Sequence, residues 1–323
     1  MTIVPAYEEV LRAAERIRPH VNRTPVLTSR TLNRMTGCSL FFKAENFQKV
    51  GAFKARGACN AVFSLTEDEA RHGVATHSSG NHAAAVAYAA GLRGIPAIVV
   101  MPDDAPPVKR AAVEGYGPRI VTSGSHPLDR ERMLEEVVAE TGATFIHPSN
   151  DPRVIAGQGT AALELVEEVP DLDVVMVPVG GGGLLAGTAL AVAGRSPGTR
   201  VIAVEPEAVD DAYRSFRDGR IYPPTNAETV ADGLRTFLGD VNFPIIREYV
   251  AEIVTVSEGG IVEAMRLVWE RMKIIIEPSS AVPVAALFEE PLAGRCRGLR
   301  VGITLSGGNV DLERLPWMGQ TRS

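Results

Sequence analysis

The stretch "VVMVPVGGGGLLAGTALAVAG" at residues 174–194 carries no charged residue and approaches the length of a membrane span. Pro178 and four consecutive glycines, 180–183, lie inside it, and these residues break or weaken a continuous helix. A short apolar run before the glycines and a helical pattern after them indicate a buried strand, a loop and a helix. We therefore predict no membrane segment here.

The same order of strand and helix recurs along the chain. Helical patterns separate the apolar runs, and several of these patterns end at a glycine. Such alternation predicts a doubly wound α/β architecture. The first 18 residues also have apolar side chains at helical spacing. The runs that we interpret as buried parallel strands are residues 73–78, 96–101, 119–123, 174–179, 200–205 and 300–306.

Length and composition limit the classes of protein to consider. A chain of 323 residues predicts two lobes, and its net charge of −6 argues against a nucleic-acid partner or an anionic membrane surface. The chain has three cysteines, Cys38, Cys59 and Cys296, and no C-x-x-C motif. A disulfide framework or a thiolate zinc site is therefore disfavoured. The N-terminus is acidic early and has no apolar signal-peptide core. We expect a cytoplasmic protein.

Small, polar and acidic residues follow four of the predicted strands. In open α/β sheets, ligands bind beyond the carboxyl ends of the strands, so these segments predict the floor of a cleft. The segments are "SSGNH" (78–82), "GGGGLLAG" (180–187), "EPEAVDDAYRSF" (205–216) and "SGGN" (306–309).

The glycine run predicts a phosphate site, because its backbone amides lie at the start of a helix. Gly181, Gly183 and Ala186 also satisfy G-x-G-x-x-A, and Glu205 ends the next strand. This is the dinucleotide fingerprint with its ribose-binding acid, so a nicotinamide-dependent dehydrogenase is one alternative. The motif falls in mid-chain, however, and this alternative leaves Lys54 unexplained.

Lys54 is one of only five lysines, and Phe53 and several small residues surround it in the sequence. Poor solvation lowers the pKa of a lysine and makes the neutral amine available to form a Schiff base with a carbonyl. A desolvated lysine together with a phosphate site indicates pyridoxal phosphate, which has both an aldehyde and a phosphate.

Five stretches, in order over residues 41–309, carry a family resemblance: "FFKAENFQKVGAFKARGA", "THSSGNHAAAVAYAA", "HPSNDPRVIAGQGT", "PVGGGGLLAG" and "ITLSGGN". They resemble the serine/threonine dehydratase and serine racemase family of pyridoxal-phosphate enzymes. The resemblance implies the tryptophan-synthase-β fold, known as fold type II, with twisted, mostly parallel sheets flanked by helices. The stretches "DDAYRSF", "VADGL", "EPSSAVP" and "NVDLERLPW" look most like the 3-hydroxyaspartate dehydratase branch.

The resemblance also implies roles for individual residues. Lys54 would hold the cofactor aldehyde and then act as base on one face of the substrate Cα, with Ser79 on the opposite face. The implied cofactor contacts are Phe53, Lys54, Asn81, Gly180, Gly181, Gly182, Gly183, Leu184 and Ser306, where Ser306 would face the ring nitrogen. The implied substrate contacts are Ser78, Ser79, His82 and Arg130.

A divalent cation is implied as well. Glu205, Asp211 and the carbonyl of Val209 match the metal site of the family, and oxygen ligands suit Mg²⁺, Mn²⁺ or Ca²⁺. Glu205 thus has three interpretations: ribose ligand, metal ligand or surface acid. One departure concerns Ala52, because the family usually has Ser or Thr before Phe-Lys. The missing hydroxyl leaves the substrate preference open.

The expected reaction is β-elimination from a β-hydroxy amino acid, which gives an oxo acid and ammonia. We expect 3-hydroxyaspartate as substrate, with L-serine and L-threonine as further candidates; the alternative is a serine or aspartate racemase. Residues 1–68 and 149–323 should form a large cofactor-binding domain, and residues 69–148 a small domain. The partners expected are a small-molecule amino acid and, by resemblance, a second copy in a homodimer.

Overall fold

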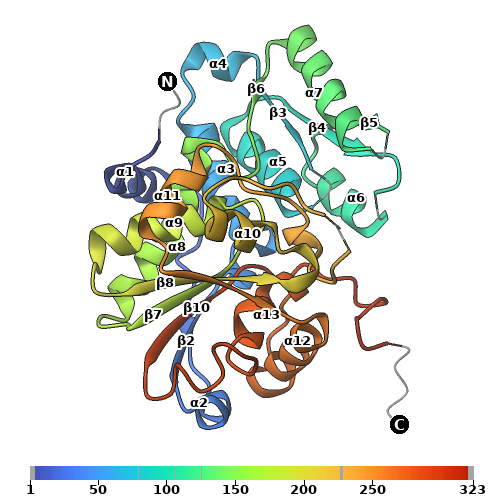
Figure 1. Ribbon diagram of the computed structural model, residues 1–323. Coiled ribbons are helices and arrows are strands. Elements are labelled where there is room, and N and C mark those ends of the chain that lie inside the picture. Colours follow the sequence, from blue (N-terminus) through green and yellow to red (C-terminus); the bar gives the residue numbers. More distant parts are fainter. Residues whose placement is uncertain (1–3, 79, 106, 125, 226–227, 319–323) are drawn as a thin grey trace.

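The computed structural model describes residues 4–318, with gaps at 79, 106, 125 and 226–227. Its described residues form two separate β-sheets, each flanked by helices (Figure 1). The four-stranded sheet lies wholly within residues 74–145, and the six-stranded sheet is built from chain on both sides of that segment. The α/β fold class is therefore confirmed.

The six-stranded sheet is parallel except for the first pairing, in which β1 runs antiparallel to β2. Its central strand β7 leads into the glycine run at its carboxyl end. The strands in spatial order are β1 (Val26–Leu27), β2 (Ser39–Ala44), β10 (Arg300–Leu305), β7 (Val174–Pro178), β8 (Arg200–Pro206) and β9 (Glu252–Val256).

The four-stranded sheet is parallel throughout. Its strands in spatial order are β5 (Arg119–Ser123), β4 (Ala97–Pro102), β3 (Val74–His77) and β6 (Thr144–Phe145). Helix α7 (Pro127–Thr141) packs on one face, while α5 (Asn81–Arg93) and α6 (Pro107–Glu114) pack on the other.

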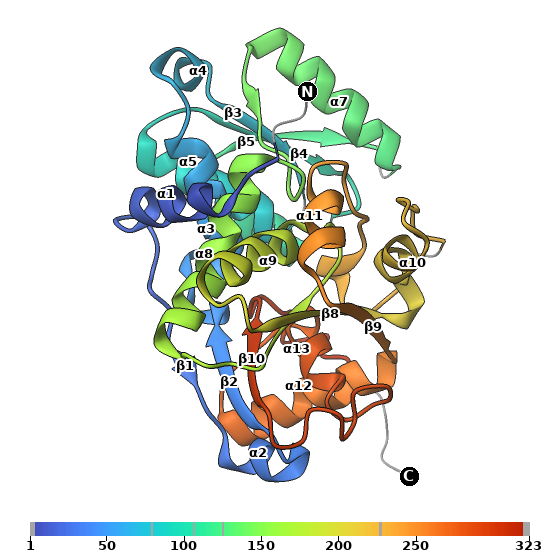
Figure 2. The ribbon, with the colours of Figure 1, turned by 60° about the vertical axis from the view of Figure 1, so that its left-hand side comes forward.

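Helices cover both faces of the larger sheet, as Figure 2 shows. One face is covered by α1 (Tyr7–Ile17), α8 (Pro152–Glu168), α9 (Gly183–Arg195) and α11 (Asn242–Tyr249). The other face is covered by α2 (Arg30–Thr36), α12 (Glu258–Met272) and α13 (Pro278–Ala285). The remaining α-helices of the described chain are α3 (Lys54–Phe63), α4 (Glu67–Arg71) and α10 (Asp211–Asp218).

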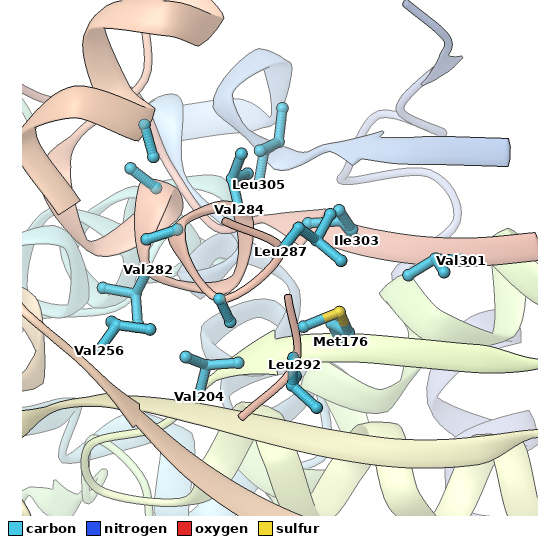
Figure 3. Packing of buried hydrophobic residues seen from close by; sticks show 14 of the residues in the cluster. Met176, Val204, Val256, Val282, Val284, Leu287, Leu292, Val301, Ile303 and Leu305 are labelled. Carbon is cyan, nitrogen blue, oxygen red and sulfur yellow. The ribbon is translucent and has the colours of Figure 1, made fainter. Parts of the chain in front are cut away.

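Strand side chains alternate between two hydrophobic cores. Met176 and Val204 point to the core beneath α12 and α13 (Figure 3). Val175, Val177 and Ala203 point to the core beneath α8 and α9. Because both faces are buried, the strands appear in the sequence as continuous apolar runs.

The six predicted strands are all present, with ends within a residue or so of the predicted ones. The predicted N-terminal helix is α1. Four further strands were not predicted, namely β1, β2, β6 and β9.

A cluster of buried charges fixes the helix that begins at Lys54. Arg56, two residues into α3, is fully buried, and its guanidinium donates to Glu45 (2.7 and 2.8 Å) and to Glu164 of α8 (2.7 and 2.9 Å). Lys43 of β2 also donates to Glu164, at 2.6 Å. Burial alone would lower the pKa of Arg56, but the two carboxylates hold it above its ordinary value. The cluster thus joins β2, α3 and α8.

Replacing Arg56 should destabilise the protein severely, because Arg56→Met leaves two carboxylates buried without their main partner. We expect a loss of about 3–5 kcal/mol and a Tm lower by roughly 10 °C. The control is Arg71→Met, which removes an exposed ion pair with Asp68 and should change Tm by about 1 °C or less. Scanning calorimetry of both variants makes the comparison, and similar Tm values would contradict it.

Candidate active site

Lys54 is the first residue of α3, and its side chain reaches toward the segment that follows β6. Its Nζ donates to the carbonyl of Pro148 at 2.8 Å and lies 5.1 Å from the centre of the Phe53 ring. Burial lowers the pKa of Lys54 to about 8, and the negative charge of Glu277 opposes this shift. Roughly a tenth of the amine is therefore neutral at pH 7, far more than for an ordinary lysine.

The glycine run forms the turn from β7 into α9. The backbone N–H groups of residues 180–184 donate to no acceptor among the described residues, as expected at a helix start. Gly182 has φ +78°, and a Cβ on Gly181 would lie 2.5 Å from Ser149 Oγ. The loop therefore needs glycine both for its backbone conformation and for close packing. Its free amides offer a site for an anion such as phosphate.

Asn81, the first residue of α5, is held at both ends of its amide. Its Nδ2 donates to the carboxylate of Glu277 at 3.0 and 3.2 Å, and its Oδ1 accepts from Asn309 at 2.8 Å. Burial raises the pKa of Glu277 to about 7, with Asn81 acting in the opposite direction. These contacts link the smaller sheet's α5 to the start of α13 and to the loop after β10.

Ser306 follows β10 and is 2% exposed. Its Oγ lies 3.1 Å from Ser280 Oγ, and its carbonyl accepts from the amide of Phe53 at 3.0 Å. The neighbouring Gly307 pairs with the buried Ala52 in a short β-bridge. The end of β10 is thereby joined directly to the turn that presents Lys54.

Of the predicted substrate contacts, Ser79 lies outside the described residues. The hydroxyl of Ser78 accepts from the amide of Gly80 at 3.2 Å. His82 is buried; its Nε2 lies 3.1 Å from the carbonyl of Ile146, and its Nδ1 has no described partner. Arg130 of α7 has a buried Nε that also has no described partner.

Glu205 and Asp211 form a second, separate group. Both side chains are fully buried, and Glu205 accepts from the amides of Ala212 (3.0 Å) and Tyr213 (2.8 Å) at the start of α10. Neither oxygen of Asp211 has a described hydrogen-bond partner. Burial raises the pKa of Asp211 to about 7 and, with the charge of Asp211, raises that of Glu205 well above its ordinary range. A ribose cannot reach a carboxylate so enclosed.

The residues around Lys54 fit pyridoxal phosphate. A partly neutral amine suits its aldehyde, and the free amides of the glycine loop suit its phosphate. The residues Glu205 and Asp211 likewise fit a cation between them, because the Asp211 oxygens are buried and unpaired. No cluster of three or more His, Cys, Asp or Glu side chains suited to a metal occurs in the described part of the chain. Backbone oxygens or water would therefore have to complete the coordination.

Comparison with known proteins decides the family. The model of the family described as "Pyridoxal-phosphate dependent enzyme" matches residues 17–307. The chain belongs to this family. It is 54% identical to the beta-hydroxyaspartate dehydratase of Paracoccus denitrificans over 314 residues, which is 97% of this chain and 99% of that protein. It is 50% identical to the L-threo-3-hydroxyaspartate ammonia-lyase of Saccharomyces cerevisiae, over 97% of this chain and 95% of the relative.

A solved structure also supports membership of this family. The serine racemase of Dictyostelium discoideum superimposes with a TM-score of 0.91 at 46% identity, over 95% of this chain and 99% of that one. The expected fold type II is thus confirmed, and the nicotinamide alternative is not supported. None of the helices in the described residues is long and apolar enough to cross a membrane.

Glu277 was not predicted as part of the site. It directly follows three isoleucines, residues 274–276, but these form neither a strand nor a helix, and Asn81, its hydrogen-bond partner, is distant in the sequence. The signal available was an acid directly before "PSSAVP", where Pro at the first helical turn marks a helix start. Only the fold brings this carboxylate to Lys54 and Asn81.

The unusual pKa of Lys54 should govern cofactor uptake. We expect the rate at which the cofactor-free enzyme takes up pyridoxal phosphate to rise with pH, with an inflection near pH 8, because only the neutral amine reacts. In Glu277→Gln the inflection should move to lower pH, since a charge that raises the Lys54 pKa is lost. Stopped-flow absorbance over pH 6–10 measures both, with Lys54→Ala as the blank. An inflection above pH 10 would contradict the assignment.

Proposed function

We propose that the protein is a pyridoxal-phosphate-dependent dehydratase that converts a β-hydroxy amino acid, preferably 3-hydroxyaspartate, into an oxo acid and ammonia. The observation that carries this proposal is the desolvated Lys54 amine, which shares one site with the unpaired amides of the glycine loop. The names of the two dehydratase relatives support the choice of reaction and substrate.

When bound, pyridoxal phosphate supplies an electron-withdrawing ring conjugated to the substrate Cα. The amides of residues 180–184 would hold its phosphate, and Asn81, oriented by Glu277, would face the ring oxygen. Lys54 would hold the aldehyde before the substrate arrives. The neutral Lys54 amine then removes the Cα proton, and its lowered pKa suits this task near neutral pH.

Loss of the Cα proton is followed by cleavage of the Cβ–O bond. The hydroxide leaves as water, and we assign its proton to Ser79. Ser306, whose Oγ lies 3.1 Å from Ser280 Oγ, would offer the ring nitrogen a hydroxyl and not a carboxylate. A hydroxyl shares a hydrogen bond without fully protonating the ring, which favours prompt elimination over a long-lived carbanion. The released enamine hydrolyses to the oxo acid and ammonia.

Arg130 supports a substrate with a second carboxylate. Its buried Nε lacks a described partner, and a planar guanidinium binds carboxylates with two parallel hydrogen bonds. Serine and threonine would leave this cation unpaired. We therefore place 3-hydroxyaspartate ahead of them.

Racemisation is the second candidate, because the chain is also similar to a serine racemase. It requires a base on each face of Cα, which the resemblance assigns to Lys54 and Ser79. Recovering unreacted serine after partial turnover and measuring its enantiomeric ratio by chiral chromatography distinguishes the two reactions.

The metal and the assembly state also belong to this proposal. Glu205, Asp211 and the carbonyl of Val209 would hold Mg²⁺, Mn²⁺ or Ca²⁺.

We also propose a cytoplasmic homodimer. Phe47 and Ile275 are about half exposed on one surface, where Asn46 donates to the Ile275 carbonyl at 3.1 Å, and such apolar exposure suits a subunit contact. Light scattering on the purified protein tests the dimer.

A substrate panel should place L-threo-3-hydroxyaspartate first. We expect its kcat/KM to exceed that of L-serine and L-threonine by about tenfold or more, because only the dicarboxylate pairs with Arg130. Oxo-acid formation, read in a coupled assay, gives the three values. Lys54→Ala should lose both turnover and the yellow colour of bound cofactor. Equal or better rates with threonine would refute the preferred substrate.

Removal of the cation should change the pH dependence of stability. The pKa of Asp211 is raised on folding from 3.8 to about 7, so in chelator the wild type loses stability as pH rises through this interval. At pH 8, Mg²⁺ at 100 times its Kd should restore about 2.7 kcal/mol. Asp211→Asn should lose the response to Mg²⁺ and the Asp211 part of the pH dependence, while the buried Glu205 keeps its own part. Asp218→Asn, on the same helix, should behave as wild type. A Tm insensitive to Mg²⁺, Mn²⁺ and Ca²⁺ at pH 8 would rule out the site.

A further inference from the structure

A cavity of about 360 Å³ lies between α7, the ends of β3 and β6, and the residues after β6. Its apolar wall is formed by Leu134, Val138 and Phe145. His77 and His147 supply its polar inner wall, while Glu131 and Glu135 are exposed residues of α7 at its outer edge. None of these residues has a role in the site described above.

The cavity adjoins the lysine. His147 immediately precedes Pro148, whose carbonyl accepts from Lys54 at 2.8 Å. The charge of Lys54 contributes to lowering the pKa of His147, which requires the two side chains to be near each other. A substrate whose Cα lies beside Lys54 can therefore extend a substituent on Cβ toward this cavity.

Backbone contacts fix the tautomer of His147. Its Nδ1 accepts from the amides of Ser149 at 3.1 Å and Asn150 at 2.9 Å, so the ring proton must be on Nε2. Burial and the neighbouring His77 lower the pKa of His147 to about 4, which keeps the ring neutral. Nε2 makes no hydrogen bond to a described residue. His147 is therefore a neutral donor at the wall of the cavity.

His77 and Arg130 are two further hydrogen-bond donors near His147. The rings of His77 and His147 are 6.2 Å apart, and neither nitrogen of His77 bonds a described residue. Burial, and then the positive charge of Arg130, lower the pKa of His77 to about 4, so Arg130 lies near this ring. The buried Nε of Arg130 has no described hydrogen-bond partner. His77 and His147 thus line the cavity with unused donors, and Arg130 lies near enough to His77 to lower its pKa. Among the described residues that line the cavity, the carboxylates are those of Glu131 and Glu135 at its outer edge.

We propose that His147, with His77 and Arg130, binds the β-carboxylate of a four-carbon dicarboxylic substrate and makes His147 a specificity-determining residue. This inference rests on the proposed function and refines it. A carboxylate accepts several hydrogen bonds, so it satisfies donors that a hydroxymethyl or methyl group would leave unpaired. Glu131 and Glu135 are exposed, where water and salt screen their repulsion.

His147→Asn tests the role of the ring's Nε2, because the asparagine Oδ1 can still accept from the amides of Ser149 and Asn150. The ratio of kcat/KM for 3-hydroxyaspartate to that for serine should fall by about 10- to 100-fold, the value of one hydrogen bond to a charged group. Arg130→Lys, which keeps the charge and loses the fork, should lower the same ratio by a smaller factor. Glu135→Gln, at the rim, is the matched control and should leave the ratio unchanged or raise it.

Succinate, which has the carbon skeleton of the substrate without its amine and hydroxyl, separates this inference from the proposed function. Calorimetry on the holoenzyme should show succinate binding that weakens about tenfold or more in His147→Asn, with unchanged circular dichroism and cofactor absorbance. An equal fall for both substrates, or unchanged succinate affinity, would overturn the subsite. Turnover of serine but not of 3-hydroxyaspartate would overturn the proposed substrate, while the succinate measurement would still decide whether His147 binds a dicarboxylate.

Discussion

The guanidinium of Arg56 is a cation with no access to water, and the rest of the site depends on how its charge is neutralised. Two carboxylates surround it, Glu45 after β2 and Glu164 on α8, and Lys43 completes a group of two positive and two negative charges. Each charge would be costly alone in this interior. Since the four come from different elements, folding must bring all of them together, and the start of α3 is set as a result.

A second, smaller group of charges sets the chemistry two residues earlier. Lys54 has one hydrogen bond to a carbonyl and one nearby carboxylate, Glu277, which itself is shared with Asn81. Such weak compensation leaves the amine partly neutral. Arg56 and Lys54 differ in this respect. Full pairing keeps the Arg56 guanidinium charged and structural, whereas incomplete pairing leaves the Lys54 amine able to transfer a proton.

The sequence was sufficient to predict residues that directly follow apolar strands. Asn81 and Ser306 belong to this class, as does the glycine run, because strand ends meet at one edge of a sheet. Strand β2 was not predicted because Lys43 interrupts its apolar pattern; in the fold, the Nζ of this buried lysine donates to Glu164 at 2.6 Å and to the carbonyl of Thr24 at 2.7 Å.

Other residues depended on contacts that no local pattern reveals. His147 follows β6, a strand of two residues that is too short to show a periodicity. Glu277 precedes a helix and meets its partners only in the folded chain. The donor state of His147 is likewise set by the amides of its own turn, which the sequence does not display.

Residues 147–149 connect three parts of the site in successive positions. His147 lines the cavity, the carbonyl of Pro148 holds Lys54, and Ser149 packs against the glycine loop, where Asn242 bridges its carbonyl to that of Gly181. An insertion or deletion here would shift all three contacts at once. The substrate-binding wall of this chain can therefore be altered without disturbing Lys54 or the glycine loop only by exchanging side chains at constant loop length.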